Sequence, residues 1–146
     1  ITQFYIVRFG EDYYMALQVS GGPTAPNDPM SVFFDVDNSG GGPEIRDRWL
    51  QFLRDGTRTT RRGNGAGGWD EFVSNDWQVA VNGAASDPWI AEIEVSAVEL
   101  AAMENPFGQL LQTVYGGTDV VINPLGGSTT DSSTWASVTN PDCPPP

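Results

Sequence analysis

The segment SVFFDVDNSGGG, residues 31–42, is the most informative part of this chain for predicting its fold class. It opens with Val32, Phe33 and Phe34, whose β-branched and aromatic side chains favour a pleated, half-buried strand. No polar residue alternates with them, which predicts a strand that is central in its sheet or buried on both sides. The run then stops in carboxylate, amide and hydroxyl side chains followed by glycine. The segment therefore predicts a core β-strand that ends in an acidic turn.

Similar strand signals, separated by turns rich in Gly, Pro, Asn and Asp, extend to both sides of this stretch. The predicted strands cover residues 2–9, 13–19, 31–35, 48–54, 76–83, 89–95, 109–115 and 118–123, and residues 57–60 and 135–138 are each a candidate for a further short strand. Residues 48–54 could also form a helix, although a strand is favoured. Residues 61–68, rich in glycine, are predicted to be a long mobile loop.

A single short helix is predicted to begin at Ser96, a good N-cap, with Glu99 as its capping-box partner. The strands do not alternate with helices, so we expect an all-β fold, an antiparallel, jelly-roll-like β-sandwich of about eight or nine strands. The length of 146 residues predicts one domain over residues 1–139, followed by a Pro-rich tail, residues 140–146.

Composition excludes several classes of function. The net charge of -12 argues against nucleic-acid binding, because the chain could not neutralise a run of phosphates. The chain has neither His nor Lys, which removes the commonest general base and transition-metal ligand. No apolar run is long enough to predict a membrane span. Since the chain starts at Ile1 and not Met, we expect that a signal peptide or upstream segment has been removed.

The acidic turn is a candidate calcium site. Oxygen-bearing side chains stand at alternate positions and are followed by Gly40, as at the start of many calcium loops. The candidate ligands are Asp35, Asp37 and Ser39, with Glu44 or Asp47 completing the shell. Arg46 occupies the position at which an EF-hand requires Glu, so the loop is not an EF-hand. The alternative is a solvated turn closed by Asx hydrogen bonds.

Tryptophans are the natural candidates for stacking on a ligand such as a sugar. Trp77 and Trp89 belong to alternating strands and are predicted to be core residues. Trp69 follows a glycine-rich segment and precedes Asp70, so these two residues are the predicted ligand-binding platform. The alternative is that Trp69 anchors its loop by burying its side chain.

Two carboxylates could suggest catalysis. Glu92 and Glu94 share one face of a strand, about 7 Å apart, which lies in the range of glycosidase carboxylate pairs. The same pattern is simply the solvent face of an amphipathic strand. Without His, Lys or a nucleophile motif, the chain is predicted not to be an enzyme.

The order of these motifs resembles the family 9 carbohydrate-binding modules and their relatives in the DOMON-like sandwich group. The matching segments, between Tyr13 and Trp135, are DYYMALQV at 12–19, VFFDVDN at 32–38, WIAEIEVSAVEL at 89–100 and TW at 134–135. Ser96 stands where the family often has Pro, and the family's Trp-containing N-terminal pattern is missing. The resemblance implies a β-sandwich, an extracytoplasmic location and often bound calcium.

For function, we predict a secreted, non-catalytic subunit that assembles with copies of itself into an extracellular or cell-surface filament, tube or layer. The apolar first strand would complete the sheet of a neighbouring subunit. The residues assigned to assembly are Phe4, Tyr5, Ile6, Val7 and Cys143. Cys143, the only cysteine, would be either an inert thiol or a disulfide to another chain. The alternative function is a carbohydrate-binding module that recognises an extracellular polysaccharide.

Overall fold

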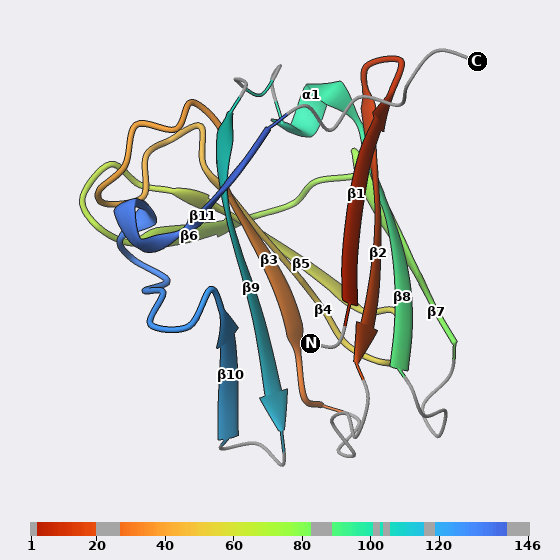
Figure 1. Ribbon diagram of the computed structural model, residues 1–146. Coiled ribbons are helices and arrows are strands. Elements are labelled where there is room, and N and C mark those ends of the chain that lie inside the picture. Colours follow the sequence, from red (N-terminus) through yellow and green to blue (C-terminus); the bar gives the residue numbers. More distant parts are fainter. Residues whose placement is uncertain are drawn as a thin grey trace.

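The computed structural model describes residues 3–19, 27–82, 89–100, 103, 106–115 and 119–139. Two antiparallel sheets face each other (Figure 1). The four-stranded sheet has the order β1 (Gln3–Phe9), β2 (Asp12–Val19), β8 (Trp89–Val95) and β7 (Trp77–Val81). The seven-stranded sheet has the order β10 (Asp119–Asn123), β9 (Phe107–Tyr115), β3 (Met30–Asp35), β4 (Arg48–Phe52), β5 (Arg58–Gly63) and β6 (Trp69–Phe72), and β11 (Ala136–Val138) also pairs with β9.

The described residues also contain the four-residue helix α1 (Ala97–Leu100) and the 3-10 turn η1 (Ser132–Thr134). The predicted antiparallel β-sandwich with one short helix is therefore confirmed. None of the described helices is long and apolar enough to cross a membrane.

Strand β3 lies between β4 and β9, and all six of its residues are buried. Val32 and Phe34 face the main core between the two sheets, whereas Phe33 faces the opposite side of its sheet. The prediction of a central strand buried on both faces is confirmed. Burial on both faces explains the apolar run Val32–Phe34, and the two buried polar residues of the strand, Ser31 and Asp35, are satisfied by side-chain hydrogen bonds.

The main core is built from alternate residues of the strands in both sheets. Trp77 and Trp89 are buried in it, as predicted. The ring of Trp89 packs edge-on against Phe52 of the opposite sheet, with centroids 6.1 Å apart. The indole Nε1 of Trp77 donates a 2.7 Å hydrogen bond to the Thr60 hydroxyl, which ties β7 to β5 across the sandwich.

The described residues form eleven strands, more than the eight or nine predicted. Residues 61–63, predicted to lie in a mobile loop, continue β5, and Trp69 begins β6 instead of ending a free loop. The last three residues of β5, Arg61, Arg62 and Gly63, carry little strand propensity of their own. Pairing in register with β4 fixes β5, and β5 in turn fixes β6. The loop prediction was wrong because sheet pairing overrides local composition.

The predicted capping box does not form at the start of α1. The Ser96 N–H donates to the Asp76 carbonyl oxygen at 2.9 Å. The Glu99 carboxylate accepts hydrogen bonds from the Arg48 Nε, at 2.7 Å, and from the Ser74 hydroxyl. Glu99 is buried, so its charge pairs with Arg48 of the opposite sheet rather than with the helix terminus. Tertiary contacts thus replace the local cap.

Strand β1 pairs with β2 of the same chain along its whole length, from Gln3 opposite Gln18 to Phe9 opposite Asp12. Its inward residues Phe4 and Ile6 pack against the main core. The strand assigned to a neighbouring subunit therefore completes the sheet of its own chain, and this pairing lends no support to self-assembly. Cys143 and the rest of the predicted tail lie outside the described residues.

Candidate functional site

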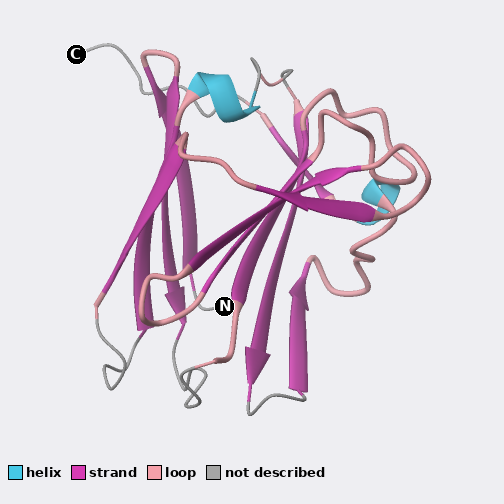
Figure 2. Ribbon diagram, turned by 180° about the vertical axis from the view of Figure 1, so that it is seen from behind, coloured by secondary structure: helices cyan, strands magenta, loops and turns pink. Residues whose placement is uncertain are grey.

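Three connections meet beside the seven-stranded sheet: residues 36–47 between β3 and β4, residues 64–68 between β5 and β6, and residues 124–135 between β10 and β11. Figure 2 shows them together on one side of that sheet. The Gly65 N–H donates to the Pro43 carbonyl oxygen at 3.1 Å, and the Ser132 N–H donates to the Gly41 carbonyl oxygen at 2.7 Å. Both of the predicted sites lie at this meeting point.

The first is an acidic cluster formed by Asp35, Asp37 and Asp47, whose carboxylate oxygens lie within 4.8 Å of one another. Asp35 ends β3 and Asp47 precedes β4, so the pairing of these neighbouring strands brings the two carboxylates together. Both side chains are buried, and Asp37 is half-buried. Three of the five predicted calcium ligands are therefore brought into one group.

The other two predicted ligands touch the cluster through their backbone. The Ser39 N–H donates to Asp35 Oδ1 at 3.1 Å, and the Glu44 N–H donates to Asp47 Oδ2 at 2.8 Å. The Glu44 side chain is exposed. In this arrangement the two residues position the carboxylates instead of supplying oxygens, although both stand next to the cluster.

The chemistry of the cluster fits a hard cation. The pKa of Asp47 is raised to about 6, chiefly by burial and also by the negative charges of Asp35 and Asp37, while backbone hydrogen bonds from Glu44 and Val36 act to lower it. Converging carboxylates in a buried setting repel one another unless a cation or protons compensate them. Carboxylate oxygens are the ligands that Ca²⁺ prefers. The group could thus hold a metal ion such as calcium.

Glycines at two sheet positions make room for the cluster. A Cβ atom on Gly63 would lie 2.1 Å from the Glu44 carbonyl oxygen, so any side chain there would displace the loop that carries Asp47. A Cβ atom on Gly108 would lie 2.9 Å from the Cβ of Asp35. The acidic turn therefore depends on glycines distant in the sequence, which no local pattern reveals.

The second site is an aromatic cluster on the outer face of the seven-stranded sheet, formed by Phe33, Trp49, Trp69 and Trp135. Phe33 lies at its centre, 4.9 Å from Trp49, 5.6 Å from Trp69 and 5.8 Å from Trp135 between ring centroids. Trp49 and Trp69 remain half-buried, and so keep part of their surface in solvent.

The 124–135 segment holds the indole rings in place. The Nε1 of Trp69 donates to the Thr129 carbonyl oxygen at 2.8 Å, and the Nε1 of Trp135 donates to that of Ser128 at 2.6 Å. The two rings lie in parallel planes, 6° apart in angle, with centroids 6.4 Å apart. The Trp69 ring is thus held in a fixed position between the 64–68 and 124–135 connections. It anchors both connections and still exposes part of its surface to solvent.

Asp70, the predicted partner of Trp69, lies on the other face of the same strand. Neighbouring residues of a strand point to opposite faces of the sheet, so Asp70 and Trp69 share no face of β6. Asp70 is exposed and stands opposite Arg62 in the register of β5 and β6. The structure therefore does not bring the two predicted ligand-binding residues together.

Sequence reasoning missed the polar side chains that surround the cluster. Arg61 lies over the ring of Trp49 at 4.1 Å, donates to the Gln51 Oε1 at 3.1 Å and pairs with Glu71 at 3.5 Å. Phe33, Trp49, Arg61 and Glu71 form one row across β3, β4, β5 and β6. Only the strand register reveals this row, because the residues are far apart in the sequence.

No protein-family model matches the chain, and no curated protein matches its sequence. Among solved structures, the chain is similar to a family 9 carbohydrate-binding module from Caldicellulosiruptor kristjanssonii in complex with cellotriose. The TM-score is 0.62, and the match covers 95% of this chain and 76% of that one at 12% identity. The chain shares its fold with a family 9 module. This confirms the resemblance drawn from the motifs, and at this identity the likeness concerns the fold alone.

Proposed function

We propose that the protein is a non-catalytic glycan-binding module that binds a neutral sugar chain at the aromatic cluster. The observation that carries this proposal is the row on the outer face of the seven-stranded sheet, where half-buried indoles adjoin Arg61, Gln51 and Glu71. Such a surface offers apolar rings to the C–H faces of a sugar and charged or amide groups to its hydroxyls.

The polar groups are already ordered by their mutual contacts. Arg61 is held by Gln51 and Glu71, and the Ser31 hydroxyl accepts hydrogen bonds from Trp49 Nε1 at 3.0 Å and Gln51 Nε2 at 3.3 Å. A ligand that meets a pre-ordered surface does not pay the full entropic cost of fixing these side chains. The site would therefore favour a rigid polar ligand with several hydroxyl groups.

The fold supports the same class of ligand, since the similar module was solved with cellotriose bound. For this chain, the glycan remains our proposal, as do an extracellular location and the absence of catalysis. Assembly with other copies stays a prediction from sequence, and the pairing of β1 with β2 gives it no structural basis.

We also propose that calcium occupies the acidic cluster and stabilises the binding surface. The Ser132 hydroxyl donates to Asp35 Oδ2 at 2.7 Å, and the Trp135 N–H donates to the Ser132 carbonyl oxygen at 3.0 Å. Two hydrogen bonds through Ser132 therefore connect the acidic cluster to the backbone of Trp135, a member of the aromatic cluster. A cation that fixes the Asp35 carboxylate would also fix the turn that carries Trp135.

The test is affinity electrophoresis of the calcium-loaded protein in gels that contain neutral polysaccharides such as hydroxyethylcellulose. Arg61→Met keeps the apolar stem over Trp49 but removes the guanidinium, and we expect about a tenfold loss of affinity. Val98→Ala is the control, because Val98 is an exposed apolar residue of α1, outside the aromatic cluster. Equal retardation of the wild type, Arg61→Met and Val98→Ala would contradict the proposed site.

A further inference from the structure

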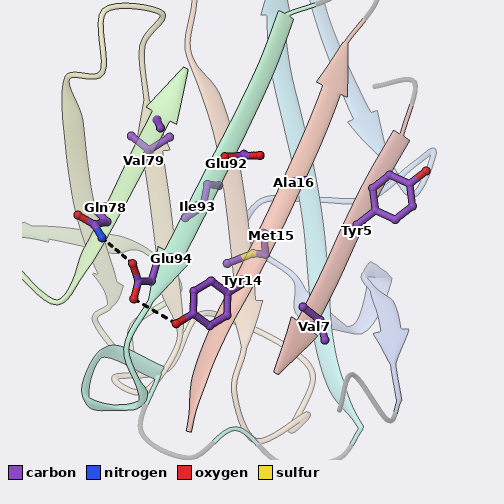
Figure 3. A pocket seen from close by; sticks show the side chains of 11 residues that line it. Tyr5, Val7, Tyr14, Met15, Ala16, Gln78, Val79, Glu92, Ile93 and Glu94 are labelled. Atoms are coloured by element: carbon purple, nitrogen blue, oxygen red, sulfur yellow. Dashed lines mark hydrogen bonds between the residues drawn. The ribbon is translucent and has the colours of Figure 1, made fainter. Parts of the chain in front are cut away.

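The outer face of the four-stranded sheet carries a groove of about 600 Å³, on the far side of the sandwich from the aromatic cluster. Figure 3 shows the side chains that line it, including Tyr5 of β1, Tyr14 of β2, Gln78 of β7 and Glu94 of β8. From this groove we infer a second glycan-binding surface, one that takes a neutral sugar chain lying across the strands.

The register of the strands places the lining residues in two adjacent rows. Val7, Tyr14, Glu94 and Gln78 stand opposite one another in one row across all four strands. The neighbouring row consists of Tyr5, Ala16, Glu92 and Ala80. Each row crosses the sheet at right angles to the strands, so a ligand that follows the rows touches every strand.

One row is fixed by side-chain hydrogen bonds. The Tyr14 hydroxyl donates to Glu94 Oε1 at 3.3 Å, and Gln78 Nε2 donates to Glu94 Oε2 at 2.5 Å. Figure 3 shows these three side chains as a connected group across β2, β8 and β7. An ordered carboxylate beside a phenol and an amide presents both acceptors and donors at fixed positions, as recognition of sugar hydroxyls requires.

The second row provides the depth of the groove. Ala16 and Ala80 flank the exposed Glu92, and their short side chains lower the surface on both sides of it. Tyr5 stands at the β1 end of this row and is 61% exposed. An exposed aromatic ring beside a low floor offers a surface on which a sugar ring can stack.

A second hollow adjoins the groove at the β7 side of the sheet. It has a volume of about 400 Å³, shares Gln78 and Glu94 with the first and reaches Arg58 of β5. Two neighbouring hollows suit a chain of sugar units better than a single compact ligand. The ring of Trp77 also lines this second hollow, beneath Arg58.

Charge selects among possible ligands. The lining of the first hollow contains the carboxylates of Glu92 and Glu94 and no Arg, so it would repel a uronic-acid or sulfated polymer. The groove is also lined by the apolar surfaces of Tyr5 and Ala16, with which a small hydrated cation would make no favourable contact. The remaining chemistry is that of a neutral polyhydroxylated chain.

The inference rests on the proposed glycan-binding function for the class of ligand, but it concerns different residues. With one site on each outer face, a single molecule could hold two chains at once. Linked sites gain avidity on a polymer without any new contact. We therefore expect the protein to cross-link a soluble neutral polysaccharide.

The experiment follows backbone amide NMR shifts during titration with cellohexaose, in the wild type and in the Arg61→Met and Tyr14→Ala variants. We expect saturable shifts of the amide resonances of β2, β8 and β7. These shifts should persist in Arg61→Met, whereas in Tyr14→Ala the affinity derived from them should fall at least fivefold. We further expect that hydroxyethylcellulose competes and that carboxymethylcellulose does not.

Absence of shifts on these strands while Arg61-dependent binding persists would overturn the second surface and leave the proposed function standing. Shifts on these strands alone would leave this surface standing and refute the proposed site. Equal competition by carboxymethylcellulose, or saturable binding of an oligoarginine peptide without binding of cellohexaose, would overturn the assignment of a neutral sugar.

Discussion

The outer faces of the two sheets use similar aromatic residues in opposite ways. On the seven-stranded sheet, Phe33 is completely buried, because Trp69 and Trp135 lie against it and the 124–135 segment holds their indoles. On the four-stranded sheet, Tyr5 and Tyr14 are 61% and 38% exposed. An outward aromatic residue thus becomes part of a second core where connections cross over it, and remains a surface residue where none does.

Truncation of Phe33 should produce the largest difference between the faces. Phe33→Ala leaves a cavity at the centre of the aromatic cluster and should cost about 3–5 kcal/mol in the free energy of unfolding. Tyr14→Ala, on the open face, should cost only about 1 kcal/mol. Urea denaturation of both variants measures the two values. Similar losses for both would show that the two faces do not differ as described.

Calcium binding at the acidic cluster should give the second largest change in the free energy of unfolding. Binding to the folded state alone adds about 2.7 kcal/mol at a hundredfold excess over Kd. The melting temperature should therefore rise with calcium in the wild type and fall with chelator. Asp47→Asn removes one charge from the acidic cluster at nearly constant volume, and should abolish most of this dependence. Identical melting curves for the wild type with calcium and with chelator would rule out the site.

Trp69 is intermediate between the fully buried Phe33 and the exposed Tyr14, since it is half-buried and hydrogen-bonded to Thr129. Trp69→Ala should cost about 1–2 kcal/mol, less than the 3–5 kcal/mol expected for the core residue Trp89. The variant should stay folded at room temperature and bind hydroxyethylcellulose more weakly. Circular dichroism melts and gel retardation measure these effects. Complete unfolding of Trp69→Ala would make this residue a core residue only.

The smallest effect is expected on the open face. Tyr14→Phe removes one hydrogen bond to the Glu94 carboxylate at an exposed position and should cost roughly 0.5 kcal/mol. Its ring remains available for stacking, so cellohexaose binding at this face should fall less than in Tyr14→Ala. Calorimetric titration compares the two variants. Equal losses in both would assign the effect to the hydroxyl rather than the ring.

The fold could be predicted from local patterns because its central strands carry them. The apolar run of β3 and the alternation of β8 reflect burial on two faces and on one face. Asp35 and Asp47 could be predicted as candidate ligands of one site, because the alternating oxygens begin at Asp35 and Asp47 follows shortly after the acidic turn. The row of Trp49, Arg61 and Glu71 could not be predicted, because it depends on the register of β4, β5 and β6, which no local pattern gives.

Binding of a neutral glycan against the half-buried indoles of the aromatic cluster should be visible at the indole N–H groups themselves. The measurement is titration of the calcium-loaded protein with cellotriose while the indole N–H resonances of all tryptophans are followed by NMR. We predict saturable shifts for Trp49 and Trp69, and none of comparable size for Trp89, which is fully buried between the sheets. Unchanged Trp49 and Trp69 resonances across the titration would show that no glycan binds at the aromatic cluster.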